Sequence, residues 1–302
     1  PDGSVLAKTG STPHGQGHVT TWSMLISDEL GIPMDRIEVV FGDTDVIPHS
    51  GLTGGSRSVQ IAGSAMVDAS QRLVDLARTR ASDLLEANVD DIVLDRDRGV
   101  FHVAGTPART VTWQDVAATN GSAAAGGSGA DGAADGDGAL VAVSQFAQAA
   151  ASFPFGAHLA VVELDTETGH VRLVRHVAVD DCGTVINPLL CDGQVHGALA
   201  QEAAQALLEE VRYDEDGNPL TANFADYAVI SMTELPSFER TPMVTPSPLN
   251  PLGAKGIGEA GTIGSTPAVQ NAVVDALAPY GVRHLDMPCT PEKVWRAITA
   301  SA

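Results

Sequence analysis

The sequence is poor in basic residues. Its 302 residues include 17 lysines and arginines against 38 aspartates and glutamates, which gives a formal net charge of -21 at pH 7. Proteins that bind nucleic acids or anionic membrane surfaces need basic patches. The charge balance therefore argues against both kinds of partner, and solubility alone explains it.

Cysteine is also scarce. The three cysteines, Cys182, Cys191 and Cys289, are odd in number and show no CxxC spacing. They therefore predict neither a disulfide framework nor a zinc or iron–sulfur site. We expect them to be buried free thiols in a reducing compartment.

The sequence contains no uninterrupted apolar stretch long enough to cross a bilayer. Its first residues, Pro1-Asp2-Gly3, have neither the basic nor the apolar region of a signal peptide. The chain begins without methionine and enters a strand-like run at residues 4–7, which predicts a processed or truncated start. We expect a cytoplasmic protein with no membrane span.

A tract of low complexity divides the chain. Residues 120–138 are almost wholly glycine, alanine, serine and aspartate, a composition that buries little surface and is typical of a flexible or disordered insertion. The whole length is sufficient for one large core or two ordinary ones. We predict a first lobe over residues 1–118, a flexible insertion over 119–150 and a second lobe over 151–302.

The hydrophobic pattern on either side of this tract alternates between helical and extended periodicity. In the first lobe it predicts a helix that runs from Gly17 to Leu30, a second helix over 59–87, and strands at 37–41, 92–94 and 100–103. In the second lobe it predicts strands at 158–164 and 170–179, a helix over 195–211, a hairpin turn at 214–217 and a final helix from Thr290-Pro291. The predicted fold class is α+β, with two similar lobes of helices packed on mixed sheets.

The densest group of glycines lies in residues 250–264. Five glycines fall within twelve residues around one cation, Lys255, and one carboxylate, Glu259. This segment is too rich in glycine for the interior of a stable helix or strand, so we expect a loop. The next helix would begin with Thr266 as N-cap and Pro267 as its first residue. Glycines let a backbone approach a bulky ligand, although a surface turn with a solvated glutamate would have the same composition.

Four segments share one arrangement, in which a glycine-rich loop with a polar side chain opens a helix. Their polar residues are Gln16, Ser56 with Ser58, Gln194, and Glu259. Helix N-termini offer unpaired N–H groups and the positive end of a dipole, which suits phosphates, and glutamine can both donate and accept hydrogen bonds. Converging in a cleft between the lobes, the four loops would form a cradle for a large anionic cofactor. Taken singly, each polar residue could also be an ordinary helix-start residue, and none of the loops matches GxxxxGK[ST] or GxGxxG.

The order of the motifs indicates a resemblance to a known protein family. The motifs are Gly15-Gln16-Gly17-His18, Gly54-Gly55-Ser56-Arg57-Ser58, Asn187-Pro188 with Gly193-Gln194-Val195-His196-Gly197, and Lys255-Gly256-Ile257-Gly258-Glu259-Ala260-Gly261. In this combination the sequence resembles the molybdopterin-binding large subunit of the xanthine dehydrogenase/aldehyde oxidase family of molybdenum hydroxylases. It is most similar to the aerobic carbon monoxide dehydrogenase type. The resemblance spans the chain except residues 120–138 and matches the C-terminal part of such a subunit, so the half that contains the substrate-discriminating loop would lie upstream.

The resemblance implies a role for each motif. Glu259 would be the catalytic base that activates the oxygen nucleophile at the molybdenum, a task that calls for partial burial of the carboxylate. Gln194 would lie near the oxo ligand of the metal. The other expected cofactor-binding residues are Gln16, Gly17, Gly55, Ser56, Arg57, Ser58, Lys255, Gly256 and Gly258. No side chain would ligate the metal, which is held through the dithiolene of the pterin.

The implied cofactor is molybdenum in molybdopterin cytosine dinucleotide, used to transfer a water-derived oxygen to carbon monoxide, an aldehyde or an N-heterocycle. The 2Fe-2S clusters and FAD would belong to partner chains, in agreement with the few cysteines here. The implied assembly is a dimer of heterotrimers, in which the large subunit with its N-terminal half joins an iron–sulfur subunit and an FAD subunit.

One residue departs from the family pattern. Glu202 stands where relatives usually carry a glycine, and it follows Gln194 by about two helical turns. It would either perturb packing near the pterin or face solvent.

Two other hypotheses remain open: a non-catalytic scaffold or degenerate paralogue of the same fold, and an enzyme of another class whose glycine loops bind a nucleotide.

Overall fold

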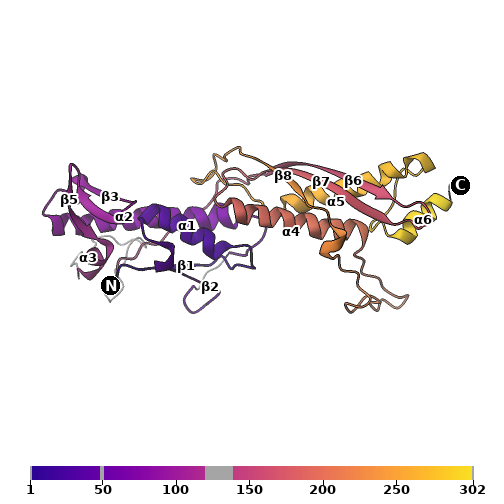
Figure 1. Cartoon of the computed structure of the whole chain (residues 1–302). Helices are drawn as coiled ribbons and strands as arrows, with labels where there is room; N and C mark the ends of the chain where they lie inside the picture. Colours follow the sequence, from indigo (N-terminus) through magenta and orange to yellow (C-terminus); the bar gives the residue numbers. More distant parts are fainter. Residues whose placement is uncertain (1, 48–50, 120–138, 301–302) are drawn as a thin grey trace. The chain divides into compact units, whose positions relative to one another are not determined.

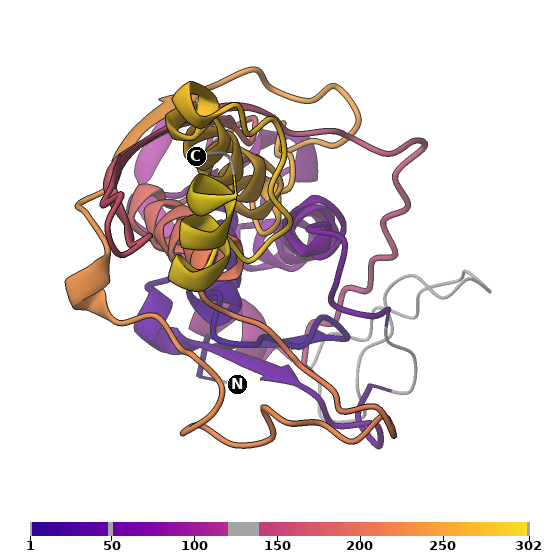
Figure 2. The same ribbon diagram turned by 90° about the vertical axis from the view of Figure 1, so that its right-hand side faces the viewer.

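The computed structural model describes residues 2–47, 51–119 and 139–300 (Figure 1). The chain divides into two compact units, and Figures 1 and 2 show the same ribbon from two sides. Unit 1 comprises residues 1–151 together with 248–252, and unit 2 comprises residues 152–247 and 253–302.

The first sheet of unit 1 is a parallel pair of strands. β1 (Val5–Thr9) pairs with β2 (Ile37–Phe41), and the connection between them carries helix α1 (His18–Leu30). Parallel neighbours require a crossover of this kind. α1 ends at Gly31, whose φ of 66° lies in the left-handed region that glycine adopts without strain, and the Gly31 N–H caps the helix by donating to the Ser27 carbonyl.

The second sheet of unit 1 is antiparallel, in the order β3 (Ile92–Asp95), β4 (Val100–Val103), β5 (Thr106–Thr112). The long helix α2 (Ser64–Leu85), which continues from a π-helical turn at Val59–Gly63, contacts all three strands. The short helix α3 (Trp113–Ala118) follows, and Trp113 donates its indole N–H to the Leu30 carbonyl at 2.8 Å. Among the described residues of unit 1, the largest fully buried side chains are Trp22, Phe101, Leu30 and Ile92.

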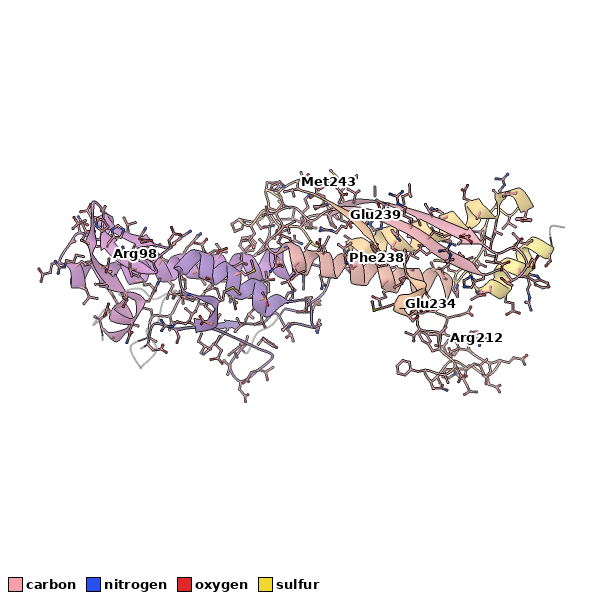
Figure 3. All side chains as sticks on the ribbon, in the orientation of Figure 1. Arg98, Arg212, Glu234, Phe238, Glu239 and Met243 are labelled. Atoms are coloured by element: carbon pink, nitrogen blue, oxygen red, sulfur yellow. The ribbon has the colours of Figure 1, made fainter. Side chains whose placement is uncertain are left out.

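Unit 2 is built on a mixed sheet. β6 (Phe155–Leu164) and β7 (Val171–Asp181) form an antiparallel hairpin, and β7 pairs in parallel with β8 (Glu239–Met243), whose two ends are labelled in Figure 3. Helix α5 (Ala260–Ala276) contacts β6 and β7, and helix α4 (Pro188–Leu207) contacts α5. Helix α6 (Pro291–Thr299) closes the core, which includes Leu173, Ala203, Val269, Val273, Leu277 and Val294. Single 3₁₀ turns occur at Met34–Arg36, Val89–Asp91, Met232–Glu234 and Ala278–Tyr280.

The predicted α+β class is confirmed, with helices packed on mixed and antiparallel sheets. The two units use different sheets, so the expected similarity of two lobes does not extend to their strand arrangement. Strands β5 and β8 and helix α3 were not predicted, because their sequences carry little regular alternation. The hairpin turn at residues 214–217 is present, with the Gly217 N–H donating to the Asp214 carbonyl.

Two helix starts were predicted wrongly. α4 begins at Pro188 rather than Val195, because the Asn187 side chain caps the helix by accepting from the Leu190 N–H at 3.0 Å and proline suits the first helical position. α5 begins at Ala260 rather than Pro267, so the expected loop ends earlier and Pro267 lies inside the helix. Gly261 and Gly264 are helical because they allow close packing against Ala198 and the His158 ring.

The predicted insertion lies mostly outside the described residues, since 120–138 are not described. Residues 139–147, the described part of this predicted insertion, form no helix or strand but pack within unit 1. Leu140 packs on its core, and the Ser144 hydroxyl donates to Asp68 at 2.6 Å. Together with β1, α1 and α2, residues 139–146 line a cavity of about 1100 Å³ within unit 1.

Candidate functional site

The first candidate loop leads into α1. Gly15 has φ 97°, and Gly17, the N-cap residue, has φ 79°. Among the described residues no side chain caps this helix, and its first turn contains no acidic residue. A side chain built at Gly15 would meet nothing within 4 Å, so the backbone is open to approach. Gln16 is half-buried and accepts a hydrogen bond from the His14 N–H.

The second candidate loop leads into the π-helical turn before α2. Gly55 and Ser56 both have positive φ, 64° and 51°, and for a serine this conformation is unusual. The side chains of Arg57 and Ser58 follow, exposed and half-buried respectively. The Thr53 hydroxyl donates to the Thr12 carbonyl at 2.8 Å, which holds this loop against the first one. The structure therefore brings together the two loops of unit 1.

Gln194 does not open a helix, contrary to the sequence prediction. It lies in the second turn of α4, half-buried, because the helix already begins at Pro188. Gly193 and Gly197 lie on the same helix, and a side chain built at either one would meet nothing within 4 Å. This part of α4 therefore has an open face beside Gln194.

The loop that precedes Glu259 is held to the end of β7. Lys255 donates its backbone N–H to the Cys182 carbonyl at 2.7 Å, and its ammonium lies 3.4 Å from the Asp181 carboxylate. Gly183 faces Ala254 in an isolated antiparallel bridge. Gly183 has φ 68°, and an added Cβ there would lie 2.2 Å from the Gly253 carbonyl oxygen, so this contact requires glycine.

Asp181 is the anion at the base of this loop. Its Oδ1 accepts from the backbone N–H groups of Gly183 at 2.8 Å and Thr245 at 3.1 Å. Burial by itself would raise the pKa of Asp181, but the hydrogen bonds from Thr245 and Gly183 and the charge of Lys255 outweigh it and lower the pKa to about 2. Lys255 is thus bound in a structural ion pair, and its predicted contact with a cofactor stays a prediction.

Glu259 is the N-cap residue of α5. Its backbone carbonyl accepts the first helical hydrogen bond, from the Ile263 N–H at 3.0 Å. Its side chain is exposed, so the described residues of this chain do not supply the partial burial expected of a catalytic base. Gly258 is likewise exposed, whereas Gly256 is buried.

Glu259 and Gln194 lie at the same end of the α4–α5 pair. A Cβ built at Gly261 would lie 2.6 Å from the Ala198 Cβ and 3.4 Å from the Val195 carbonyl oxygen. Further along, the Thr266 hydroxyl donates to the carboxylate of Glu202. The two helices therefore run side by side in the same direction, with the two predicted catalytic-centre residues near their N-terminal halves.

Glu202 does not face solvent, contrary to one of the two expectations for it. Its side chain is buried between α4 and α5, where it accepts the hydrogen bond from Thr266. Thr266 lies inside α5, which begins at Ala260, so it is not the N-cap that the sequence indicated. Burying a carboxylate is costly unless a donor satisfies it, and Thr266 provides that donor.

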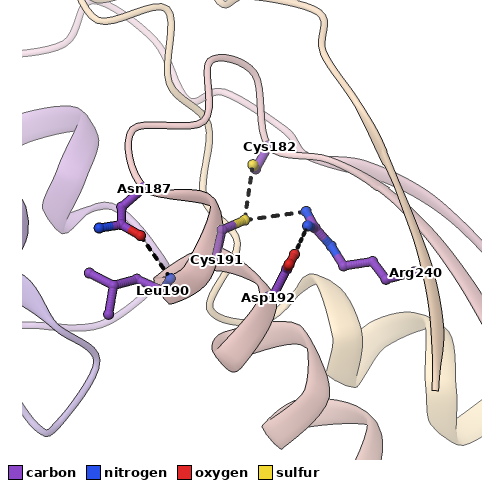
Figure 4. A network of polar contacts seen from close by, with 6 residues as sticks. All are labelled: Cys182, Asn187, Leu190, Cys191, Asp192 and Arg240. Carbon is purple, nitrogen blue, oxygen red and sulfur yellow. Dashed lines mark hydrogen bonds and ion pairs between the residues drawn. The ribbon is translucent and has the colours of Figure 1, made fainter. Parts of the chain in front are cut away.

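A cluster at the end of β7 was not predicted (Figure 4). Cys182 and Cys191 lie with their sulfur atoms 3.7 Å apart, and Arg240 donates to both the Cys191 sulfur, at 3.3 Å, and the Asp192 carboxylate. Cys182 directly follows β7, Cys191 and Asp192 lie in α4, and Arg240 lies in β8. No local sequence pattern indicates that these residues meet. The run of polar residues directly after the buried part of β7 could have indicated a site there.

Within the part of the chain that the structure describes, no helix is long and apolar enough to cross a membrane. Nor do three or more histidine, cysteine, aspartate or glutamate side chains come together as a potential metal site in the described ranges.

Comparison with known proteins gives one consistent result. The family model for the molybdopterin cofactor-binding domain matches residues 1–236. The chain is 39% identical to the carbon monoxide dehydrogenase large chain of Afipia carboxidovorans, over 98% of this chain and 35% of that protein. It is 36% identical to the nicotine 6-hydroxylase large subunit of Paenarthrobacter nicotinovorans, over 98% of this chain and 35% of that one.

A solved structure agrees with these relatives. The crystal structure of the Cu,Mo-CO dehydrogenase in the carbon monoxide reduced state superposes with a TM-score of 0.86 and 36% identity, covering 98% of this chain and 36% of that one. The chain thus spans about a third of the length of the relatives that it matches. The chain belongs to the molybdopterin cofactor-binding domain family, as found in the large subunits of molybdenum hydroxylases related to carbon monoxide dehydrogenase.

Proposed function

We propose that this chain is the C-terminal part of the catalytic large subunit of a molybdenum hydroxylase, in which it binds molybdopterin cytosine dinucleotide and supplies Glu259 as the base. One observation carries the proposal: the chain matches such subunits along almost its whole length. The position of the exposed Glu259 agrees with it, since Glu259 lies at the start of α5, at the same end of the α4–α5 pair as Gln194.

The residues present fit an anionic cofactor. Although the chain carries a formal net charge of -21, the first turns of α1, α4 and α5 contain no acidic residue. The start of α1 has open glycine backbone and no side-chain cap among the described residues, an arrangement that suits a phosphate. Arg57 adds an exposed cation in the loop held against this one. The cavity of unit 1 is lined largely by apolar side chains such as Val5, Ile61 and Leu73, which do not suit a phosphate.

In this proposal the cofactor supplies the metal centre at which a water-derived oxygen passes to the substrate and two electrons are taken up. The chain supplies the proton chemistry and the positioning. The Glu259 carboxylate accepts a proton from the oxygen nucleophile. The Gln194 amide orients a neighbouring oxygen by donating a hydrogen bond. Asp181 fixes Lys255, and Lys255 in turn fixes the start of the loop that leads to Glu259.

The partial burial that a general base requires would come from the cofactor and from the remaining part of the subunit. The two loops of unit 1 would contact the pterin and its phosphates through Gln16, Gly17, Gly55, Ser56, Arg57 and Ser58. Gly256 and Gly258 would let the loop before Glu259 approach the same cofactor.

The relatives narrow the reaction class but not the substrate. One is named for carbon monoxide and another for nicotine, and their identities to this chain are close, 39% and 36%. We therefore propose oxygen transfer to a small electrophilic carbon, in carbon monoxide, an aldehyde or an N-heterocycle. The electrons would leave through 2Fe-2S clusters and FAD on partner chains of a dimer of heterotrimers.

The test is cofactor analysis of the full-length subunit, purified with its partners from a host that makes the cytosine dinucleotide form. We expect about one molybdenum and one released cytosine nucleotide per chain, together with substrate-dependent electron transfer. A folded complex without molybdenum would instead support a scaffold or degenerate paralogue. A different bound nucleotide without molybdenum would support an enzyme of another class.

A further inference from the structure

The cysteine cluster of unit 2 has the geometry of a reactive thiol pair. The sulfur atoms of Cys182 and Cys191 lie 3.7 Å apart, in van der Waals contact, and a disulfide would bring them to about 2 Å. Cys182 directly follows β7, and Cys191 lies in the first turn of α4, so the two come from different elements (Figure 4). The approach needed is small compared with the freedom of a residue after a strand end and of a first helical turn.

The surroundings activate one sulfur in particular. The Arg240 guanidinium donates to the Cys191 sulfur at 3.3 Å, and Cys191 also lies at the N-terminal end of a 20-residue helix. The hydrogen bond from the Cys182 thiol and the charge of Arg240 lower the pKa of Cys191 despite the opposing effects of burial and Asp192. The pKa of Cys182 is raised, first by its hydrogen bond to Cys191 and then by burial. One sulfur is thus suited to attack as a thiolate, and the other is held as the partner thiol.

We propose that Cys182 and Cys191 form a reversible, peroxide-sensitive disulfide that ties the end of β7 to the start of α4. The Cys191 thiolate attacks one oxygen of hydrogen peroxide, the O–O bond breaks, and the products are a sulfenic acid and a hydroxide that takes up a proton to leave as water. The Cys182 sulfur then attacks the sulfenic sulfur, the S–O bond breaks, and the hydroxyl leaves as water with the Cys182 proton. Two thiols are oxidised and one peroxide is reduced to two waters.

Small oxidants can reach the pair better than bulky reagents. Cys191 is 8% exposed and Cys182 is 5% exposed, while the neighbouring Asp192 side chain is 45% exposed. The bond would form one helical turn before Gln194, and the Cys182 carbonyl accepts the Lys255 N–H. Oxidation would therefore act next to the proposed cofactor site, but the bond itself does not depend on a cofactor.

The third cysteine, Cys289, is an internal control for oxidation of the pair. Cys289 is buried, at 1% exposure, and burial raises the pKa of its thiol. Among the described residues no arginine donates a hydrogen bond to its sulfur, and the charge of Lys293 opposes the effect of burial without outweighing it. We therefore expect it to stay reduced under conditions that oxidise the pair.

The experiment is thiol mapping of the full-length protein by differential alkylation and peptide mass spectrometry, before and after hydrogen peroxide and then dithiothreitol. We expect a linked peptide that contains Cys182 and Cys191, lighter by two hydrogens and recovered by the reductant, while Cys289 stays alkylatable. Both thiols still free after peroxide, or either one linked to Cys289 or to a second chain, would overturn the proposal.

Three variants sharpen the test. Cys182→Ser should stop the reaction at a sulfenic acid on Cys191, which a dione probe can trap. Arg240→Gln should slow oxidation several-fold, and Arg240→Lys should restore most of the rate because it keeps the charge. Equal rates for the glutamine variant and the parent protein would contradict the assigned role of Arg240. The mapping of the unmodified protein decides the proposal even if a variant fails to fold.

Discussion

Lys255 and Asp181 form a nearly buried ion pair, with the ammonium nitrogen 3.4 Å from the carboxylate oxygen and the side chains 13% and 3% exposed. The pair joins the end of β7 to the loop that leads to Glu259. Asp181 also accepts two backbone hydrogen bonds, so the carboxylate organises both segments. The position of the predicted base thus depends on a residue that sequence reasoning did not identify.

We predict that Asp181→Asn destabilises the chain by on the order of 3 kcal/mol, because it leaves a nearly buried Lys255 without its counter-charge. Urea unfolding followed by circular dichroism measures the change. The control is Glu239→Gln, which breaks an ion pair with Arg175 whose side chains are 50% and 56% exposed, and it should change stability little. Equal effects of the two substitutions would show that Asp181 has no special structural role.

The same carboxylate predicts loss of stability in acid. Because the folded-state pKa of Asp181 is lowered from 3.8 to about 2, its contribution is present above pH 4 and is lost as the pH falls toward 2. Acid unfolding of the parent protein should therefore be steeper than that of Asp181→Asn in this range. Identical acid profiles would contradict the assignment.

His176 predicts a second pH dependence, at higher pH. Burial first, and then the nearby His158, lower its pKa from 6.5 to about 4, so the unfolded chain binds more protons between these values. Stability is then full above pH 6.5 and falls by up to about 3 kcal/mol as the pH drops toward 4. His176→Leu should flatten this slope at little cost, since neither ring nitrogen has a hydrogen-bond partner in the described structure. His284→Gln, at an exposed histidine, should leave the slope unchanged.

The contact between α4 and α5 predicts opposite effects for two glycine substitutions. Gly261→Ala should destabilise by about 1–2 kcal/mol, because the added methyl would lie 2.6 Å from the Ala198 Cβ. Gly197→Ala, on the open face of α4, should stabilise by roughly 0.5–1 kcal/mol through helix propensity. Urea unfolding of both variants against the parent decides the matter, and a stabilising Gly261→Ala would show that the two helices are not in close contact.

Glu259→Gln tests the proposed base. In the assembled enzyme we expect the molybdenum content to be retained and turnover to fall by about 10²–10⁴-fold, since the substitution keeps the shape and removes the proton acceptor. Steady-state kinetics beside metal analysis gives the result. Glu215→Gln, at an exposed hairpin position, serves as the matched control and should leave turnover unchanged. Near-normal rates in Glu259→Gln at normal metal content would remove Glu259 from the mechanism.

Several features followed from the sequence because they depend on local interactions. Helix α1 after Gly17, strand β2, the hairpin turn at 214–217 and helix α6 after Thr290 are set by positive-φ glycines, alternation and caps, all of which act within a few residues. The motif order around Gln16, Ser56, Gln194 and Glu259 was sufficient to indicate the family, which the comparisons then showed.

Other features were decided only by the tertiary structure, because they depend on contacts between residues far apart in the chain. A glycine-rich segment was predicted as a loop, but it is helical from Ala260 onward because Gly261 and Gly264 fit against Ala198 and His158. Helix propensity, worth about 1 kcal/mol per glycine, cannot anticipate packing of that kind. The burial of Glu202 against Thr266, the anchoring of Lys255 by Asp181, and the meeting of Cys182, Cys191 and Arg240 each join separate elements. The fold determines which residues meet in these contacts, because the neighbouring sequence does not specify which distant side chain lies within reach.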